Sequence, residues 1–411
     1  MTATERALRA MDEEQVFLDG VVPASRVCPD LDARTLLHAG PPIDPEEVGG
    51  PLLGALTGAL LYEGAARTAD EAERLVRTRA IALRPCHDAG AVGAAAGVVS
   101  RSMPVVVVRG AGGGAAFSPL NEGAGRALRF GCYDPETLAH LRWMADIAAP
   151  VLDDAARRAE LELTSLVAES LRRGDEAHGR TVAGASLLVA ALAPHVVDGG
   201  LPGASETLRW AGRNRHLFNT FAIAAGKAIA DRGALVPSPL VSAIASNGVR
   251  AGIRVGACEG RWFTAPAPLG RPHLSPGFRT EDASPVLGDS FIAEVVGLGC
   301  AALAAAPASA AYFGLSPGRS AAIVARLRQT CAGVSGRFLV PAEDFAGTPL
   351  GIDVREVARR ALAPIVSNAV AHRAAGVGQI GAGITELPLD PFLEAARELD
   401  RRSAAAGTAG A

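Results

Sequence analysis

The sequence predicts an α+β fold in which two α/β domains flank a mostly helical middle domain. Residues 1–134 mix short strand-like runs with helical stretches, and residues 135–234 show helical periodicity almost throughout. Strand-like runs return over residues 235–400. A chain of 411 residues is long enough for two or three domains with hydrophobic cores of their own.

The N-terminal segment is expected to combine short strands with one long helix. The strand-like runs are residues 35–37, 80–83 and 104–108. The helix is expected over residues 44–62, because Pro41, Pro42 and Asp44 are typical of a helix start.

The rest of the chain is first helical and then alternating. Helices are expected over residues 135–158, 160–173, 178–194 and 206–232, separated by glycines. Strands are then expected at 241–245, 252–256 and 336–340, and helices at 316–330 and 354–363. Residues 401–411 are expected to form a disordered tail.

Composition excludes several classes of protein. The net charge of −3 argues against nucleic acid or an anionic membrane as the main partner. Six scattered cysteines without a Cys-x-x-Cys pair suggest neither a zinc ribbon nor a disulfide framework, and the N-terminus lacks an apolar secretory signal, so we expect a cytoplasmic protein. Residues 295–318 are uncharged, but Pro307 and Pro317 favour buried interior over a membrane span.

Lys227 is the only lysine among forty basic residues. It shares a predicted helix face with Asn219 and Ile223, each four residues from the next. A functional or buried role is expected; the alternative is a surface lysine whose stem lies along Ile223.

Four glycines fall within the eight residues 376–383. Such a run after a segment expected to be helical, residues 371–373, predicts backbone close to a ligand. We expect the N–H groups here to cradle phosphate, although a tight turn is the alternative and neither the dinucleotide fingerprint nor the P-loop spacing is present. The candidate phosphate-binding residues are Gly376, Gly378, Gln379 and Gly381.

Two histidines follow strand-like runs, where ligands of α/β domains tend to bind. His87 stands in Pro-Cys-His-Asp-Ala-Gly and is expected to be catalytic, with Cys86 left to packing. His38 is either substrate-binding or bonded to the turn backbone. Asn121 and Glu122 are expected to face the same crevice, although Asn121 could simply cap the next element.

Two further acid/base candidates stand where helices are expected to begin. His178 follows Asp175 and Glu176, which a helix start explains as caps, but capping does not explain the histidine. Asp289 precedes a helix bearing Glu294, and is either an N-cap or a catalytic carboxylate.

Arg254 and Arg261 are predicted on or beside neighbouring strands, after Asn247-Gly248. Guanidinium groups bind carboxylates bidentately, so both arginines could point at one substrate carboxylate. Asn247 is a further substrate-binding candidate.

Taken together, these segments resemble one family, the YlbE-like large subunit associated with oxamate carbamoyltransferase. The resemblance covers nearly the whole chain and rests on residues 36–42, 85–93, 121–131, 142–144, 174–178, 261–266, 288–294 and 372–383. It implies the same three-segment fold, and exchange of a carbamoyl group between carbamoyl phosphate and oxamate, giving oxalurate and phosphate in purine (allantoin) breakdown. It also implies an acyl-CoA-synthetase-like partner subunit and a third subunit, and we expect a homo-oligomer.

Carbamoyl transfer needs a site for the leaving phosphate, a site for the acceptor carboxylate and a base. The candidates are residues 376–383 for the phosphate, Arg254 and Arg261 for the carboxylate, and His178 or His87 for the base. The transferase requires no cofactor and no metal, and the Ser-Thr-Arg-Thr phosphate loop of aspartate and ornithine carbamoyltransferases is missing. The alternatives are a metal-dependent hydrolase of an N-carbamoyl or cyclic amide compound, and a non-catalytic scaffold subunit.

Overall fold

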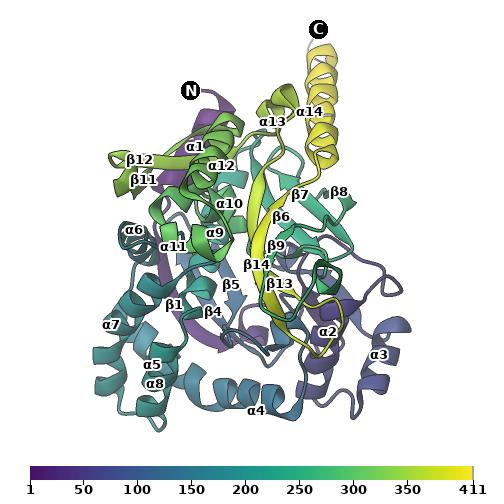
Figure 1. Ribbon diagram of the computed structural model, residues 1–411, viewed down its shortest axis with the longest axis vertical. Helices are drawn as coiled ribbons and strands as arrows, with labels where there is room; N and C mark the ends of the chain where they lie inside the picture. Colours follow the sequence, from purple (N-terminus) through teal and green to yellow (C-terminus); the bar gives the residue numbers. More distant parts are fainter. Residues whose placement is uncertain (410–411) are drawn as a thin grey trace.

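The computed structural model describes residues 1–409, and their side chains as far as residue 405. It is a mixed α+β structure in which helices surround several small sheets (Figure 1). The helices are α1 Ala3–Glu13, α2 Gly50–Tyr62, α3 Ala69–Arg77, α4 Pro135–Trp143, α5 Ala149–Ala159, α6 Leu163–Arg172, α7 Val182–Gly199, α8 Ala204–Arg213, α9 Leu217–Ala234, α10 Ile292–Val295, α11 Pro307–Tyr312, α12 Pro317–Thr330, α13 Val354–Arg360 and α14 Asp390–Ala409.

The strands pair mostly with antiparallel neighbours. They are β1 Val16–Pro23, β2 Thr35–His38, β3 Ala82–Pro85, β4 Pro104–Gly110, β5 Ala115–Pro119, β6 Val241–Asn247, β7 Arg250–Val255, β8 Phe263–Pro266, β9 Arg271–Leu274, β10 Leu287–Gly288, β11 Cys331–Val340, β12 Ala346–Ile352, β13 Ile365–Ala371 and β14 Gln379–Glu386. Their orders are β1-β4-β5, β10-β6-β7-β8, β13-β14-β9, β11-β12 and the parallel pair β2-β3.

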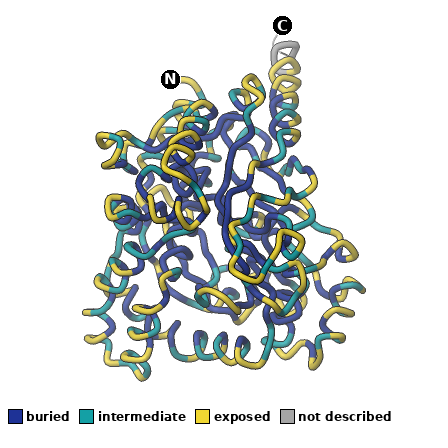
Figure 2. The backbone as a smooth tube through the Cα atoms, in the orientation of Figure 1, coloured by how far each residue is buried: buried dark blue, intermediate teal, exposed yellow. Residues whose placement is uncertain are grey.

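Helix α9 runs through the centre of the molecule. Its residues are apolar on nearly all sides and almost all are buried, as expected for a helix enclosed by other elements (Figure 2). Around it the largest hydrophobic cluster joins Val106, Phe221 and Ile253, one from each predicted segment. The core is therefore shared among the three segments, and their division into domains remains a prediction.

The local predictions of strands and helices are largely confirmed. Helix α2 begins at Gly50 instead of residue 44, and the helix expected over 206–232 is two helices, α8 and α9, separated at Asn214–His216. Residues 371–373, expected to be helical, are the end of β13 and the turn after it. Residues 295–318 form short helices and turns, which are buried over residues 295–306 as expected but mostly exposed over residues 307–318.

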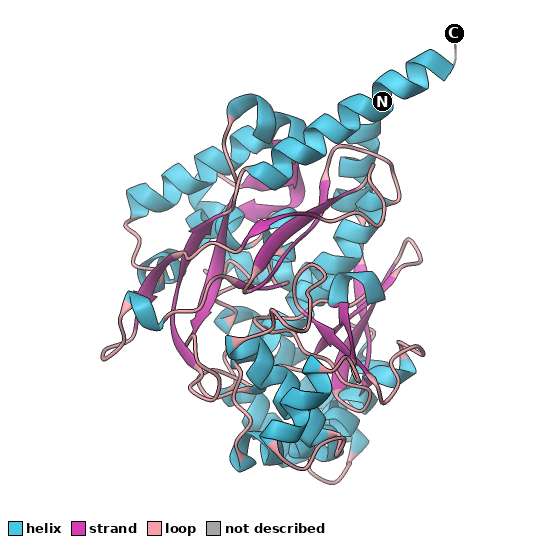
Figure 3. Cartoon of the chain, turned by 90° about the vertical axis from the view of Figure 1, so that its right-hand side faces the viewer, coloured by secondary structure: helices cyan, strands magenta, loops and turns pink. Residues whose placement is uncertain are grey.

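The end of the chain departs from expectation. Residues 401–409, predicted to be disordered, continue α14, which projects from the body of the molecule (Figure 3). Residues 410 and 411 lie outside the described residues. One described helix, α7, is long and apolar enough to cross a membrane. Of this helix, 28% is buried inside the protein.

Candidate functional site

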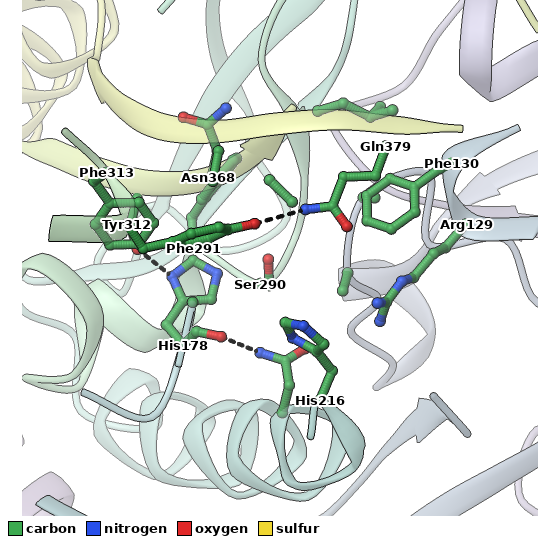
Figure 4. Close-up of a pocket in the computed structure, with 18 residues that line it drawn as sticks. Arg129, Phe130, His178, His216, Ser290, Phe291, Tyr312, Phe313, Asn368 and Gln379 are labelled. Atoms are coloured by element: carbon green, nitrogen blue, oxygen red, sulfur yellow. Dashed lines mark hydrogen bonds between the residues drawn. The ribbon is translucent and has the colours of Figure 1, made fainter. Parts of the chain in front are cut away.

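A small pocket lies where β13 and β14 approach the start of α9 (Figure 4). The space inside it that the centres of water-sized molecules can reach is about 50 Å³. The pocket is lined by Ala94, Ala95, Arg129, Phe130, His178, Gly179, His216, Asn219, Leu287, Ser290, Phe291, Tyr312, Phe313, Ser367, Asn368, Ala369, Gln379 and Ala382.

His178 is held by a carboxylate and a hydroxyl from distant parts of the chain. Its Nδ1 lies 3.1 Å from Glu294 Oε1 and 2.9 Å from Ser367 Oγ, and the Ser367 hydroxyl donates to the same carboxylate oxygen at 3.0 Å. Because the carboxylate accepts, we assign a proton to Nδ1. The other ring nitrogen, Nε2, is then left on the pocket side (Figure 4).

The loop before α7 presents His178 to the pocket. The Glu176 carboxylate accepts the backbone N–H groups of residues 178, 179 and 180, and Asp175 accepts that of Gly184 in the first turn of α7. Both carboxylates therefore accept hydrogen bonds from backbone N–H groups, as expected for residues near a helix start. The helix itself begins at Val182, after His178. The Asn219 amide completes the support by donating to the His178 carbonyl at 2.8 Å.

Burial and charge act in opposite directions on this group. Burial lowers the pKa of His178, but the carboxylates of Glu294 and Glu176 more than offset it, so that the pKa of the ring is raised. Burial raises the pKa of Glu176 to about 7. The two carboxylates therefore favour the protonated form of the His178 ring, which suits this side chain to accept a proton.

Arg129 supplies the cation of the pocket. It belongs to the turn Leu128–Phe130, its Nη2 donates to the Gly123 carbonyl, and its guanidinium lies 4.8 Å from the centre of the Phe130 ring. Its Nε atom is buried and has no hydrogen-bond partner among the described residues. A donor in that condition is available to an anion.

Neutral polar groups complete the lining. His216 has its pKa lowered to about 4 by burial and by Arg129, so its ring is uncharged at neutral pH. Gln379 Nε2 donates to Tyr312 Oη at 3.2 Å, and Thr385 Oγ1 donates to the Asn368 side-chain oxygen at 2.9 Å. Within residues 1–409 no cluster of three or more His, Cys, Asp or Glu residues is suited to hold a metal ion.

The structure places the predicted site residues in several locations. Among the predicted residues, His178 and Gln379 line this pocket. Glu122 lies beside it: its carboxylate accepts the Leu128 N–H at 3.0 Å and borders a smaller pocket that shares Arg129. His87, Lys227 and Arg254 line a separate, open pocket on another part of the molecule.

Three predicted residues have buried structural contacts instead. Asp289 Oδ1 accepts the Gly40 N–H at 2.7 Å, and burial raises the pKa of this carboxyl well above its usual range. Asn247 donates to the Pro41 carbonyl, and the Nδ1 atom of buried His38 contacts the Ala39 carbonyl. Neither pocket is lined by these residues.

The expectation that Arg254 and Arg261 bind one common carboxylate is not met. Arg254 pairs with Asp88 at 3.1 Å, whereas Arg261 pairs with Glu394 at 2.7 Å and Glu398 at 3.2 Å. The acids on α14 draw Arg261 away, so each guanidinium has its own protein partner.

The glycine segment does not form the expected anion nest. The N–H groups of Gly376 and Gln379 donate to the carbonyls of Gly131 and Gly125, and Gly381 lies within the paired strand β14. Gly378, Gly381 and Gly383 allow close packing of the backbone: a Cβ on Gly378 would lie 2.9 Å from the Gly125 oxygen. The segment is the turn between β13 and β14, as in the alternative weighed above.

Sequence reasoning missed Arg129, His216, Ser367 and Asn368. The sequence does hold one signal, the polar pair Ser-Asn within the apolar run of residues 365–371. Arg129 carries no such signal, because arginine is common throughout this chain.

The fold and this site define a mixed α+β protein with a small polar pocket that contains a buried His–Glu pair and an arginine. A family model described as oxamate carbamoyltransferase subunit AllG matches residues 81–290, and the chain belongs to that family. This confirms the resemblance inferred from the sequence.

The chain is similar over most of its length to two other proteins and to one solved structure. It is 37% identical over 387 residues to oxamate carbamoyltransferase subunit AllG of Escherichia coli K12, covering 92% of each chain. It is 35% identical over 398 residues to uncharacterized protein YahG of the same organism, covering 96% of this chain and 84% of that protein. A conserved protein of unknown function from Enterococcus faecalis V583 has a similar structure, with a TM-score of 0.94, 36% identity and 97% coverage of both chains.

Proposed function

We propose that this chain catalyses the transfer of a carbamoyl group between carbamoyl phosphate and oxamate, or a similar small amide-bearing acid. The reaction takes place in the pocket lined by His178 and Arg129. The observation that carries the proposal is the His178–Glu294 pair, whose free ring nitrogen faces a pocket that also holds an arginine with an unpartnered N–H. Membership of the AllG family supports the choice of reaction.

The residues provide what the reaction needs. In the synthetic direction the amide nitrogen of the acceptor attacks the carbamoyl carbon, a C–N bond forms, and the C–O bond to phosphate breaks. His178 Nε2 takes the proton that the nitrogen loses and passes it to the departing phosphate. Arg129 binds the phosphate oxygens, whose negative charge increases as the C–O bond breaks.

The proposal includes partner subunits. The name of the relative is that of a subunit, and we infer from the family resemblance an acyl-CoA-synthetase-like partner and a third chain. The pocket of this chain holds both an acid/base group and a cation, which argues against a purely structural contribution to the complex.

The test is transfer by the complete complex. The chain, purified with its partner subunits, should convert carbamoyl phosphate and oxamate to oxalurate and phosphate in equal amounts, with no loss of rate in the presence of a chelator. Hydrolysis of oxalurate without phosphate, abolished by the chelator, would favour the metal-dependent hydrolase. Full activity of the partners without this chain would contradict the proposal.

A further inference from the structure

A second pocket, open to solvent, lies between η2 (Cys86–Ala89), α9 and the β6–β7 pair. Its volume is about 500 Å³, and it shares no lining residue with the pocket of His178. Its polar lining brings together Lys227, the chain's only lysine, with His87, Arg254, Asp88 and Asp231.

The cations lie deeper in this pocket than the acids. The Lys227 side chain is 4% exposed and that of Arg254 21%, whereas their partners Asp231 and Asp88 are 42% and 35% exposed. Water therefore screens the carboxylates at the rim more than the cations within. The inner wall is positive although the formal charges balance.

His87, on the inner wall of this pocket, is a buried polar side chain without hydrogen-bond partners among the described residues. It is only 3% exposed, yet neither ring nitrogen has a hydrogen-bond partner among the described residues. Burial, then Lys227 and Arg254, hold the pKa of His87 well below its usual range, so the ring is neutral and one nitrogen is a donor. This donor lies beside two cations and has no acceptor of its own. An anion bound in the pocket would supply one.

We infer that this second pocket is a binding site for a small oxoanion, a phosphate or a carboxylate, held by Lys227, Arg254 and His87. It goes beyond the reaction proposed for the first pocket, since the two cavities are separate. Lys227 and Asp231 are one helical turn apart on α9 at 2.5 Å, so the bound anion would compete with the Asp231 carboxylate for the ammonium group.

That competition yields a test in which removing either cation and removing the Asp231 carboxylate have opposite expected effects on anion affinity. Inorganic phosphate and, separately, oxamate are titrated calorimetrically into the full chain carrying Arg129→Gln, so that only the second pocket is followed. Lys227→Met and Arg254→Gln should each weaken binding by at least about tenfold, the scale of one hydrogen bond to a charged group. Asp231→Asn should tighten it, because the competing carboxylate is gone.

Arg109→Gln is the matched control. Arg109 pairs with Asp19 at the edge of another open pocket of about 510 Å³, whose lining includes no lysine and no histidine. The Arg109→Gln substitution should therefore leave anion binding at the second pocket unchanged. Preference for phosphate or for oxamate identifies the ligand's class. If Lys227→Met does not fold, the other two variants still decide: unchanged affinity in Arg254→Gln, or weaker binding in Asp231→Asn, would overturn the inference. Neither readout depends on carbamoyl transfer.

Discussion

His178 Nδ1 lies 3.1 Å from Glu294 Oε1, and both side chains are buried. The two residues are 116 positions apart, and a third group, Ser367, bonds to both. A carboxylate that fixes one imidazole nitrogen orients the other and raises its basicity. This relationship is the basis of the account of the first pocket.

Replacing Glu294 by Gln should lower the pKa of His178, because the amide lacks the charge that offsets burial. The limb of the pH–rate profile that reports a basic His178 should then move to lower pH. The ring's titration, followed by NMR in the chain alone, measures the shift without the reaction. Ser367→Ala, which keeps the carboxylate, should move the pKa less; an unchanged pKa in Glu294→Gln would refute the pairing.

Arg129→Gln should weaken binding of carbamoyl phosphate by at least about tenfold while the protein remains folded, because a guanidinium that faces the ligand is lost. Calorimetric titration measures this. Arg126→Gln is the control, since Arg126 lies three residues earlier on the surface, paired with Asp134. Equal losses in both variants would mean that Arg129 has no specific part in anion binding.

Gly378→Ala should destabilise the turn between β13 and β14 by about 1–3 kcal/mol. Gly378 has a φ of +106°, and its added Cβ would press on the Gly125 oxygen. Gly376→Ala has a similar backbone strain, at φ +82°, but open space around the Cβ, and should cost less. Urea denaturation compares the two; an equal cost would show that packing against Gly125 is unimportant.

The contribution of Glu176 to stability should fall as pH rises from about 5 to 8. The pKa of Glu176 is raised to about 7, so the folded state holds a proton that the unfolded state has lost above its usual pKa. The raised pKa of His178 acts in the same direction, since its contribution is lost as pH rises through the folded value. Between about pH 5 and pH 8, the wild type should lose on the order of 2 kcal/mol more stability than Glu176→Gln, as measured by denaturation. Glu176→Gln should flatten this dependence, and an unchanged slope would contradict the assignment.

Sequence reasoning singled out His178 as a candidate and predicted six of the fourteen described strands and most of the longer helices, because these depend on local patterns. It did not predict the partners. Ser367 reaches His178 across 189 residues, which no local pattern can show. Arg254 and Arg261 were expected together because their strands are neighbours, but acids from η2 and α14 hold them apart.

The glycine segment is a similar case. The sequence correctly indicated backbone conformations that need glycine, and Gly376 and Gly378 do have positive φ. The sequence could not show that the N–H groups of Gly376 and Gln379 would donate to the carbonyls of Gly131 and Gly125, which pack against the turn from another part of the chain.

The central claim is that His178 moves the proton in carbamoyl transfer, and one measurement tests it most directly. Phosphorolysis of oxalurate by the complete complex should fall by at least about 100-fold in His178→Gln, the usual contribution of a positioned acid/base group. His195→Gln, on α7 outside the pocket, should keep a rate close to wild type. A wild-type rate in His178→Gln, with the complex intact, would contradict the account.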